Sequence, residues 1–304
     1  MSYRTIITSL LLLIAPAAAA DRLLVYAVNY PLAYFAERIG GEYVEVMFPV
    51  PAGIDPAFWQ PDVDDVARFQ QADLILTNGA GYAKWLERAS LPRRKLVNTS
   101  AGFADSYIQV EQTKTHRHGP GGEHSHAGTA FTTWLDFSQA IEQARAIKQA
   151  LNRKHPEQSD TFQRNFALLE QELSDLDQTM LAIAAKQPDR LFIASHPVYQ
   201  YFARRYQISL QSVMWEPDNM PDEAQWRSLQ RKLDAHKAKW MIWEDNPDQQ
   251  SVARLKGLGL NSLVFDPCAN TPEEGDFITV MTRNINELNK AFSALENRVR
   301  DNQL

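Results

Sequence analysis

Cysteine is almost absent from this sequence. The single cysteine, Cys268, permits no internal disulfide bond, so the fold must be stabilised by packing alone. No cysteine stands where the N-terminal apolar segment ends, which argues against lipid attachment to a mature N-terminal cysteine. We therefore expect a protein that diffuses freely in its compartment.

Long hydrophobic runs are lacking too. The apolar run of residues 6–14 follows the basic Arg4 and is too short to span a bilayer core of about 30 Å. It leads into Ala18-Ala19-Ala20, an ending typical of a cleaved secretory signal, and the alternative is an uncleaved anchor. We expect residues 1–20 to be a signal peptide cleaved after Ala20, and the mature protein to reach the periplasm without stable membrane insertion, because no other window has eighteen apolar residues.

The sequence has little excess of either charge sign, with 31 Lys and Arg against 37 Asp and Glu. A net charge of −6 argues against nucleic acid as a partner. The sequence has no G-x-S-x-G elbow, no P-loop and no H-E-x-x-H pair, so we expect no enzyme. The remaining enzymatic alternative is a catalytic metal held by His196 and Asp266 with an open coordination position.

Apolar runs alternate with helical patterns in both halves of the chain. This order predicts an α/β fold with mainly parallel sheets. Between the halves, residues 159–185 carry apolar side chains at three- and four-residue steps without Gly or Pro, which predicts one helix about 40 Å long. We therefore expect an N-terminal lobe at residues 21–157, a connecting helix at residues 158–187 and a C-terminal lobe at residues 188–304.

A polar, Gly-rich segment at residues 115–126 contains four histidines: His116, His118, His124 and His126. Imidazole is the usual ligand of zinc and of several neighbouring metals. Two H-x-H pairs on such a segment suit weak, adaptable chelation. The alternatives are an accessory metal-collecting segment and a merely solvated loop.

His196 and Asp266 share a sequence context. Each follows a predicted strand, residues 191–195 and 263–265 respectively, and each precedes a proline. Ligands of open α/β sheets bind at the carboxyl ends of the strands, so the two side chains are expected to converge on one crevice. The alternative is that each is a satisfied structural residue.

Other candidates lie near these positions. Cys268 is either a soft metal ligand or a small buried side chain, and Glu244 is either an acceptor in the site or part of a surface ion pair. Phe58, Trp59 and Trp134 are either walls of the cleft or ordinary core residues.

Segments across most of the chain resemble the zinc- and manganese-type substrate-binding proteins of bacterial ABC importers. The similar segments are Tyr30-Pro31-Leu32, Ile39-Gly40-Gly41, residues 73–79, Trp134-Leu135-Asp136, Ser195-His196-Pro197 and Tyr201-Phe202-Ala203. The resemblance implies two α/β lobes joined by one long rigid helix, a monomer in the periplasm, and the permease of an ABC transporter as partner.

The resemblance also implies a site with four metal-binding groups. The first is a histidine in a segment like D-P-H-x-Y-x-P, where this sequence has Ala57, and the second stands two residues before W-L-D, where it has Thr132. The third and fourth positions match His196 and Asp266. The usual site is therefore half present.

Three additions would complete such a site. In the first, His124 or His126 from the histidine-rich segment supplies the missing ligands. In the second, Cys268 or water supplies them. In the third, the room left at Ala57 and Thr132 admits a metal chelate or a small organic ligand. We expect capture of a divalent metal, zinc by preference, with manganese or another divalent ion as the alternative. A periplasmic metal chaperone or sensor is the other functional alternative.

Overall fold

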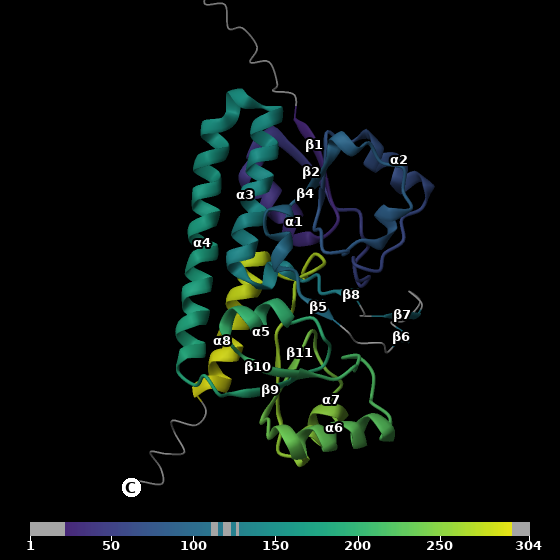
Figure 1. Ribbon diagram of the computed structural model, residues 1–304, viewed down its shortest axis with the longest axis vertical. Helices are drawn as coiled ribbons and strands as arrows, with labels where there is room; N and C mark the ends of the chain where they lie inside the picture. The colour runs from purple at the N-terminus through teal and green to yellow at the C-terminus, as the bar shows by residue number, and fades with distance from the viewer. Residues whose placement is uncertain (1–21, 111–114, 118–122, 126–127, 294–304) are drawn as a thin grey trace, which may run out of the picture.

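The computed structural model describes residues 22–110, 115–117, 123–125 and 128–293. Two four-stranded parallel sheets lie one above the other, and helices run along one side of both (Figure 1). This arrangement confirms the predicted α/β class with two lobes. The predicted signal peptide lies outside the described residues.

The N-terminal lobe is built on a sheet of order β2-β1-β3-β4. Its strands are β1 (Leu23–Ala27), β2 (Val44–Met47), β3 (Leu74–Thr77) and β4 (Leu96–Asn98). Its helices are α1 (Tyr30–Gly40), α2 (Val63–Gln71) and α3 (Phe137–Lys154). Asn29 caps α1 through the amide of Leu32, and Pro31 occupies the first turn, where a missing N–H costs nothing.

The C-terminal lobe repeats this plan with the order β10-β9-β11-β12. Its strands are β9 (Leu191–Ala194), β10 (Ser209–Ser212), β11 (Trp240–Trp243) and β12 (Asn261–Val264). Its helices are α5 (Gln200–Tyr206), α6 (Glu223–His236) and α7 (Gln249–Gly257). All pairings are parallel, so the four carboxyl ends meet at one edge.

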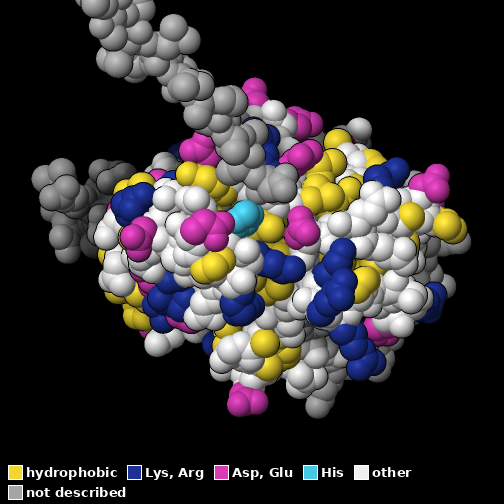
Figure 2. Space-filling view, turned by 90° about the horizontal axis from the view of Figure 1, so that it is seen from above, with side chains coloured by type: hydrophobic (Ala, Val, Ile, Leu, Met, Phe, Trp, Pro, Cys, Tyr) yellow, Lys and Arg dark blue, Asp and Glu magenta, His cyan; other side chains and the backbone are white. Residues whose placement is uncertain are grey.

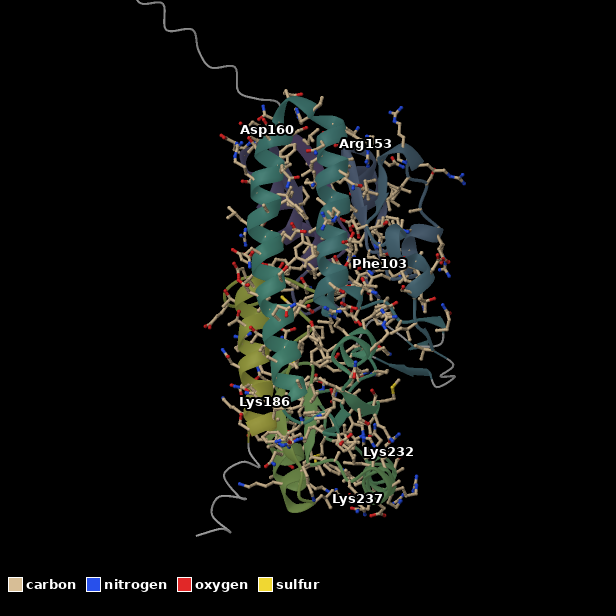
Figure 3. The ribbon with its side chains drawn as sticks, turned by 60° about the vertical axis from the view of Figure 1, so that its left-hand side comes forward. Phe103, Arg153, Asp160, Lys186, Lys232 and Lys237 are labelled. Carbon is tan, nitrogen blue, oxygen red and sulfur yellow. The ribbon has the colours of Figure 1, made fainter. Side chains whose placement is uncertain are left out.

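Helix α4 (Ser159–Ala185) is 27 residues long and joins the two lobes. Asp160, near its start, lies at the top of the molecule, and Lys186, just past its end, lies beside the C-terminal lobe (Figure 3). The helix has the bounds that its apolar spacing predicts, and α8 (Phe277–Ser293) packs against it. In its C-terminal half, the buried Asp177 accepts hydrogen bonds from Arg205 and Tyr206, which fixes the C-terminal lobe to this helix.

Direct contacts hold the lobes together across the gap between the sheets. The hydroxyl of Tyr201 donates to the carbonyl of Ala130 at 2.9 Å and accepts from the amide of Ile108 at 3.2 Å. These contacts lie beside the short antiparallel pair β5 (Gln109–Val110) and β8 (Gly128–Thr129). On the chain after β12, the carbonyl of Pro267 accepts from the indole of Trp134 at 2.7 Å.

In the two four-stranded sheets and the helices beside them, the sequence pattern indicates neither the strands β4 and β10 nor the helix α7. The two strands lie at sheet edges and are short, and β10 reads Ser-Leu-Gln-Ser, without the apolar run of a buried strand.

In the described part of the chain, no helix is both long and apolar enough to cross a membrane. Seen from the end formed by the N-terminal lobe, basic and acidic side chains are mixed over the surface (Figure 2).

Candidate metal centre

The strand order of the C-terminal sheet places four ionisable side chains side by side. Glu216 follows β10, His196 follows β9, Glu244 follows β11 and Asp266 follows β12. The chain reverses its direction of sheet growth between β9 and β11, and ligands of open α/β sheets bind at such a switch point. His196 therefore stands at the switch point with a carboxylate from each neighbouring strand.

Backbone hydrogen bonds continue beyond the strands and hold these positions. The amide of Ser195 donates to the carbonyl of Ile242 at 2.8 Å, and the amide of Trp215 donates to the carbonyl of Ser195 at 2.9 Å. The residues that follow Ser195 and Trp215 are His196 and Glu216. Their proximity therefore results from the sheet ladder and does not depend on flexible side chains.

The site itself consists of His196, Glu216 and Glu244. Nδ1 of His196 lies 2.8 Å from Oε1 of Glu244, and Nε2 lies 3.7 Å from Oε1 of Glu216. One potential ligand atom from each residue lies within 4.8 Å of the others. The imidazole is 1 % exposed and each glutamate side chain is 22 % exposed, so solvent reaches the site from the carboxylate side.

The electrostatics of the site favour a cation. Burial lowers the pKa of His196, but the charge and hydrogen bond of Glu244 and the charges of Glu216 and Asp55 raise it, and the net pKa lies above the ordinary value. Two carboxylates around one buried imidazole thus stabilise a positive charge, which a proton or a metal ion supplies.

The distances suit different roles for the two glutamates. Zinc binds imidazole nitrogen and carboxylate oxygen at about 2.0–2.2 Å, so one ion fits between Nε2 of His196 and Oε1 of Glu216. The 2.8 Å contact on the other side of the ring pairs Nδ1 of His196 with the Glu244 carboxylate. A carboxylate in that position fixes the tautomer and the orientation of a metal-binding histidine.

Asp266 lies at the same edge but is not a member of this three-residue group. Its Oδ1 accepts the amide of Cys268 at 2.7 Å, and its own amide and carbonyl bond to the side chain of Asn284. Burial raises its pKa; the Cys268 amide opposes this, whereas the charges of Asp245 and Glu244 add to it. The carboxylate that the sequence pairs with His196 is thus directed into a local turn beside Glu244.

Cys268 is buried and has a left-handed backbone, with φ of 56°. Burial raises the pKa of its thiol well above the ordinary value, and the charge of Asp266 adds to this. Because a metal binds the thiolate, these features favour the interpretation of a small buried side chain.

The two positions where the resembled family has histidines carry neither an imidazole nor a carboxylate. Ala57 is buried, and the hydroxyl of Thr132 donates to the carbonyl of Val198 in the opposite lobe. The space beside Thr132, against Phe131 and Pro197, has a volume of about 10 Å³. It admits about one water molecule.

The aromatic candidates divide between core and cleft. Trp134 is fully buried, and Trp59 packs in the N-terminal core, edge-on to Trp85 with ring centres 6.0 Å apart. Phe58 is half-buried and contacts Phe131 edge-on at 6.3 Å. Phe58 is therefore the best placed of the three to line a cleft.

The histidine-rich segment is described in part. Its backbone forms an antiparallel pair, β6 (Thr115–Arg117) with β7 (Glu123–Ser125), in which His116 stands opposite His124. His118 and His126 lie outside the described residues. The contribution of these four histidines to a site stays a prediction.

Glu216 is the functional candidate that sequence reasoning missed. It was overlooked because its strand, β10, was not recognised. A signal was present: Glu216 precedes Pro217, as His196 precedes Pro197 and Asp266 precedes Pro267. At three of the four strand ends of the C-terminal sheet, an apolar segment is followed by an ionisable residue and then by proline.

The corresponding switch point of the N-terminal sheet carries amides. Asn29 follows β1 and donates to Oδ1 of Asn78, which follows β3, at 3.3 Å. Gln143 from α3 donates to the same oxygen at 3.1 Å and to Thr99 at 3.0 Å. These buried amides are uncharged and bond to one another. The cluster of ionisable side chains therefore lies at the C-terminal sheet and not at this one.

Comparison with known proteins finds relatives with metal-related names. The chain is 24 % identical over 284 residues to a zinc-binding lipoprotein, AdcA, of Streptococcus pneumoniae; the match covers 89 % of the chain and 56 % of that protein. It is 27 % identical over 289 residues to a metal ABC transporter substrate-binding lipoprotein of Lactococcus lactis, covering 88 % of each. The chain thus spans about half the length of the AdcA relatives that it matches.

The fold is also found in solved structures. A metal-dependent lipoprotein, YcdH, of Bacillus subtilis superposes with a TM-score of 0.76 at 21 % identity, covering 88 % of this chain and 98 % of that one. Residues 25–291 match the family described as zinc-uptake complex component A, periplasmic, whose members are substrate-binding proteins and not enzymes. With most of its length matched and the predicted resemblance confirmed, the chain belongs to this family.

Proposed function

We propose that this protein captures a divalent transition metal, zinc by preference, in the periplasm and delivers it to the permease of an ABC importer. The observation that carries the proposal is the buried His196, with Glu216 and Glu244 on either side of its ring. Such a group is costly to bury without a cation. Membership of the zinc-uptake family supports the same function.

The donor set narrows the choice of metal without fixing it. One imidazole suits zinc, iron and nickel, whereas two carboxylates also suit manganese. The zinc-binding AdcA relatives support zinc as the first candidate. Water or a further side chain would complete the coordination, because zinc takes four ligands.

Isothermal titration of zinc, and separately of manganese, into chelator-stripped protein tests this function. We expect tight one-to-one binding that is lost in His196→Ala. His155→Ala is the matched control, since His155 lies beyond α3 and pairs with Glu157, away from the site. Binding no tighter than that of exposed histidines, or equal loss in both variants, would contradict the proposal.

A variant that lacks residues 115–126 separates the contribution of the histidine-rich segment. If the segment supplies a ligand, affinity falls as it does in His196→Ala. If the segment only collects ions, the one-to-one site stays intact and only weak additional binding disappears.

A further inference from the structure

The three residues of the candidate site all belong to the C-terminal lobe, but the N-terminal lobe bonds to the chain that directly follows one of them. We propose that Thr132 of the N-terminal lobe is a positioning residue of the metal site, which holds the backbone turn that carries His196. This inference rests on the proposed function and gives the N-terminal lobe a part in it.

His196 begins a tight turn that leads from β9 to α5. The amide of Val198 donates to the carbonyl of His196 at 3.0 Å, and the ring of Pro197 between them fixes its φ angle. The side chain of Gln200 donates to the carbonyl of Pro197 at 2.6 Å. The direction of the imidazole from the edge of the sheet therefore depends on where this turn is held.

The turn is held from the opposite lobe by a hydroxyl. The carbonyl of Val198 accepts a hydrogen bond from the hydroxyl of Thr132. Thr132 is 4 % exposed, and the space beside it, against Pro197, has a volume of only about 10 Å³, so this hydrogen bond is shielded from bulk water. Two hydrogen bonds in series, through Val198, thus connect Thr132 with the backbone of His196.

Two further hydrogen bonds hold the segment around Thr132 against the C-terminal lobe. The carbonyl of Ala130 accepts from the hydroxyl of Tyr201 at 2.9 Å, and the indole of Trp134 donates to the carbonyl of Pro267 at 2.7 Å. Residues 130, 132 and 134 therefore all bond to the C-terminal lobe, and the middle one bonds to the turn.

The residues on either side of Thr132 bond to the N-terminal lobe instead. Nδ2 of Asn78 donates to the carbonyl of Phe131 at 2.8 Å, and the hydroxyl of Thr133 donates to Oε1 of Gln143 at 3.2 Å. Both amide side chains are buried and bond to each other, so Thr132 is anchored to the interior of its own lobe. A turn that is held in place before the ion arrives has less freedom to lose on binding, which strengthens binding and slows release.

The zinc affinity, together with the rate of zinc release into excess chelator, tests the inference. We expect Thr132→Val, which removes the hydroxyl and keeps the shape, to weaken binding and speed release on the order of tenfold. Thr132→Ser keeps the hydroxyl and should restore both values to those of the wild type. Thr77→Val is the matched control, because it removes another buried threonine hydroxyl that donates to a backbone carbonyl, that of Val97 at 3.2 Å, and should leave zinc release unchanged.

Three results would overturn the positioning role: wild-type affinity and release in Thr132→Val, equal losses in Thr132→Val and Thr132→Ser, or equal losses in Thr132→Val and Thr77→Val. If Thr132→Val does not fold, Thr132→Ala, which places no methyl group against the carbonyl, is compared with the same control. If the wild type binds no zinc, the proposed function itself fails; if it binds zinc and His196→Ala does not, only this inference is at stake.

Discussion

Nδ1 of His196 and Oε1 of Glu244 lie 2.8 Å apart at the point where the C-terminal sheet changes its direction of growth. With Nδ1 paired to Glu244, Nε2 lies on the side of Glu216, which is where an ion would bind. In the proposed site, one glutamate would orient the imidazole and the other would share the ion with it. Because both positions follow from neighbouring parallel strands, the sheet supplies the geometry.

These roles predict different losses for the two glutamates. Glu216→Gln removes a charged ligand and should abolish tight zinc binding, whereas Glu244→Gln keeps a group beside Nδ1 and should weaken binding on the order of tenfold to a hundredfold. Competition with a chromophoric chelator measures both affinities. Glu142→Gln, at the exposed pair with Arg145, is the control, and equal losses for the two site variants would reject the division of roles.

Asp177 should contribute more to stability than any surface ion pair of this chain. Asp177→Ala leaves Arg205 and Tyr206 without their acceptor at a buried position and should lower the free energy of unfolding by about 3 kcal/mol. Glu223→Ala, which removes the exposed pair with Arg254, should cost less than about 1 kcal/mol. Urea unfolding compares the two, and similar losses would contradict this account.

The thiol of Cys268 should react slowly in the native protein. Burial raises its pKa and shields the sulfur, so an aromatic disulfide reagent at pH 8 should modify it only after denaturation. Cys268→Ala should also leave zinc affinity unchanged. A rapid native reaction that zinc prevents would show instead that the sulfur is a ligand.

Asp276 should stabilise the protein above acid pH. Burial raises its pKa, but the amide and hydroxyl of Thr279 and the hydroxyl of Tyr34 lower it more, so the folded-state pKa lies below the ordinary value. The stabilisation is therefore complete above the ordinary aspartate pKa of about 4 and is lost as pH falls through the lowered value.

Asp276→Ala tests this dependence. The variant should lose about 1 kcal/mol at pH 7, because Asp276 also caps α8 through the Thr279 amide, and it should lose less at pH 3. Urea unfolding at the two pH values gives the difference. A loss that is constant with pH would mean that the carboxylate charge has no part in it.

Much of the fold could be predicted from the chain because its patterns are strong. Helix α4 has the predicted bounds, since seven apolar side chains at helical steps run without Gly or Pro from Phe162 to Ile183. The strand β10 could not be recognised, because a polar edge strand has neither an apolar run nor clear alternation. Glu216 was missed together with it.

The sequence indicated where the candidate site lies but not which side chains meet there. A histidine after a buried strand and before proline indicated the carboxyl edge of the sheet, and His196 lies there. The sequence could not show that Asp266 would turn toward the amide of Cys268, because that choice depends on local backbone geometry. It also left Glu244 open between site and surface pair, which the strand order β9-β11 favours as a site residue.

Anomalous diffraction from crystals of the zinc-loaded protein, recorded at the zinc absorption edge, tests the central claim most directly. We predict one strong peak about 2 Å from Nε2 of His196 and from a carboxylate oxygen of Glu216, with Glu244 still bonded to Nδ1. A peak held only by other residues, with none at the carboxyl edge of the C-terminal sheet, would contradict the account.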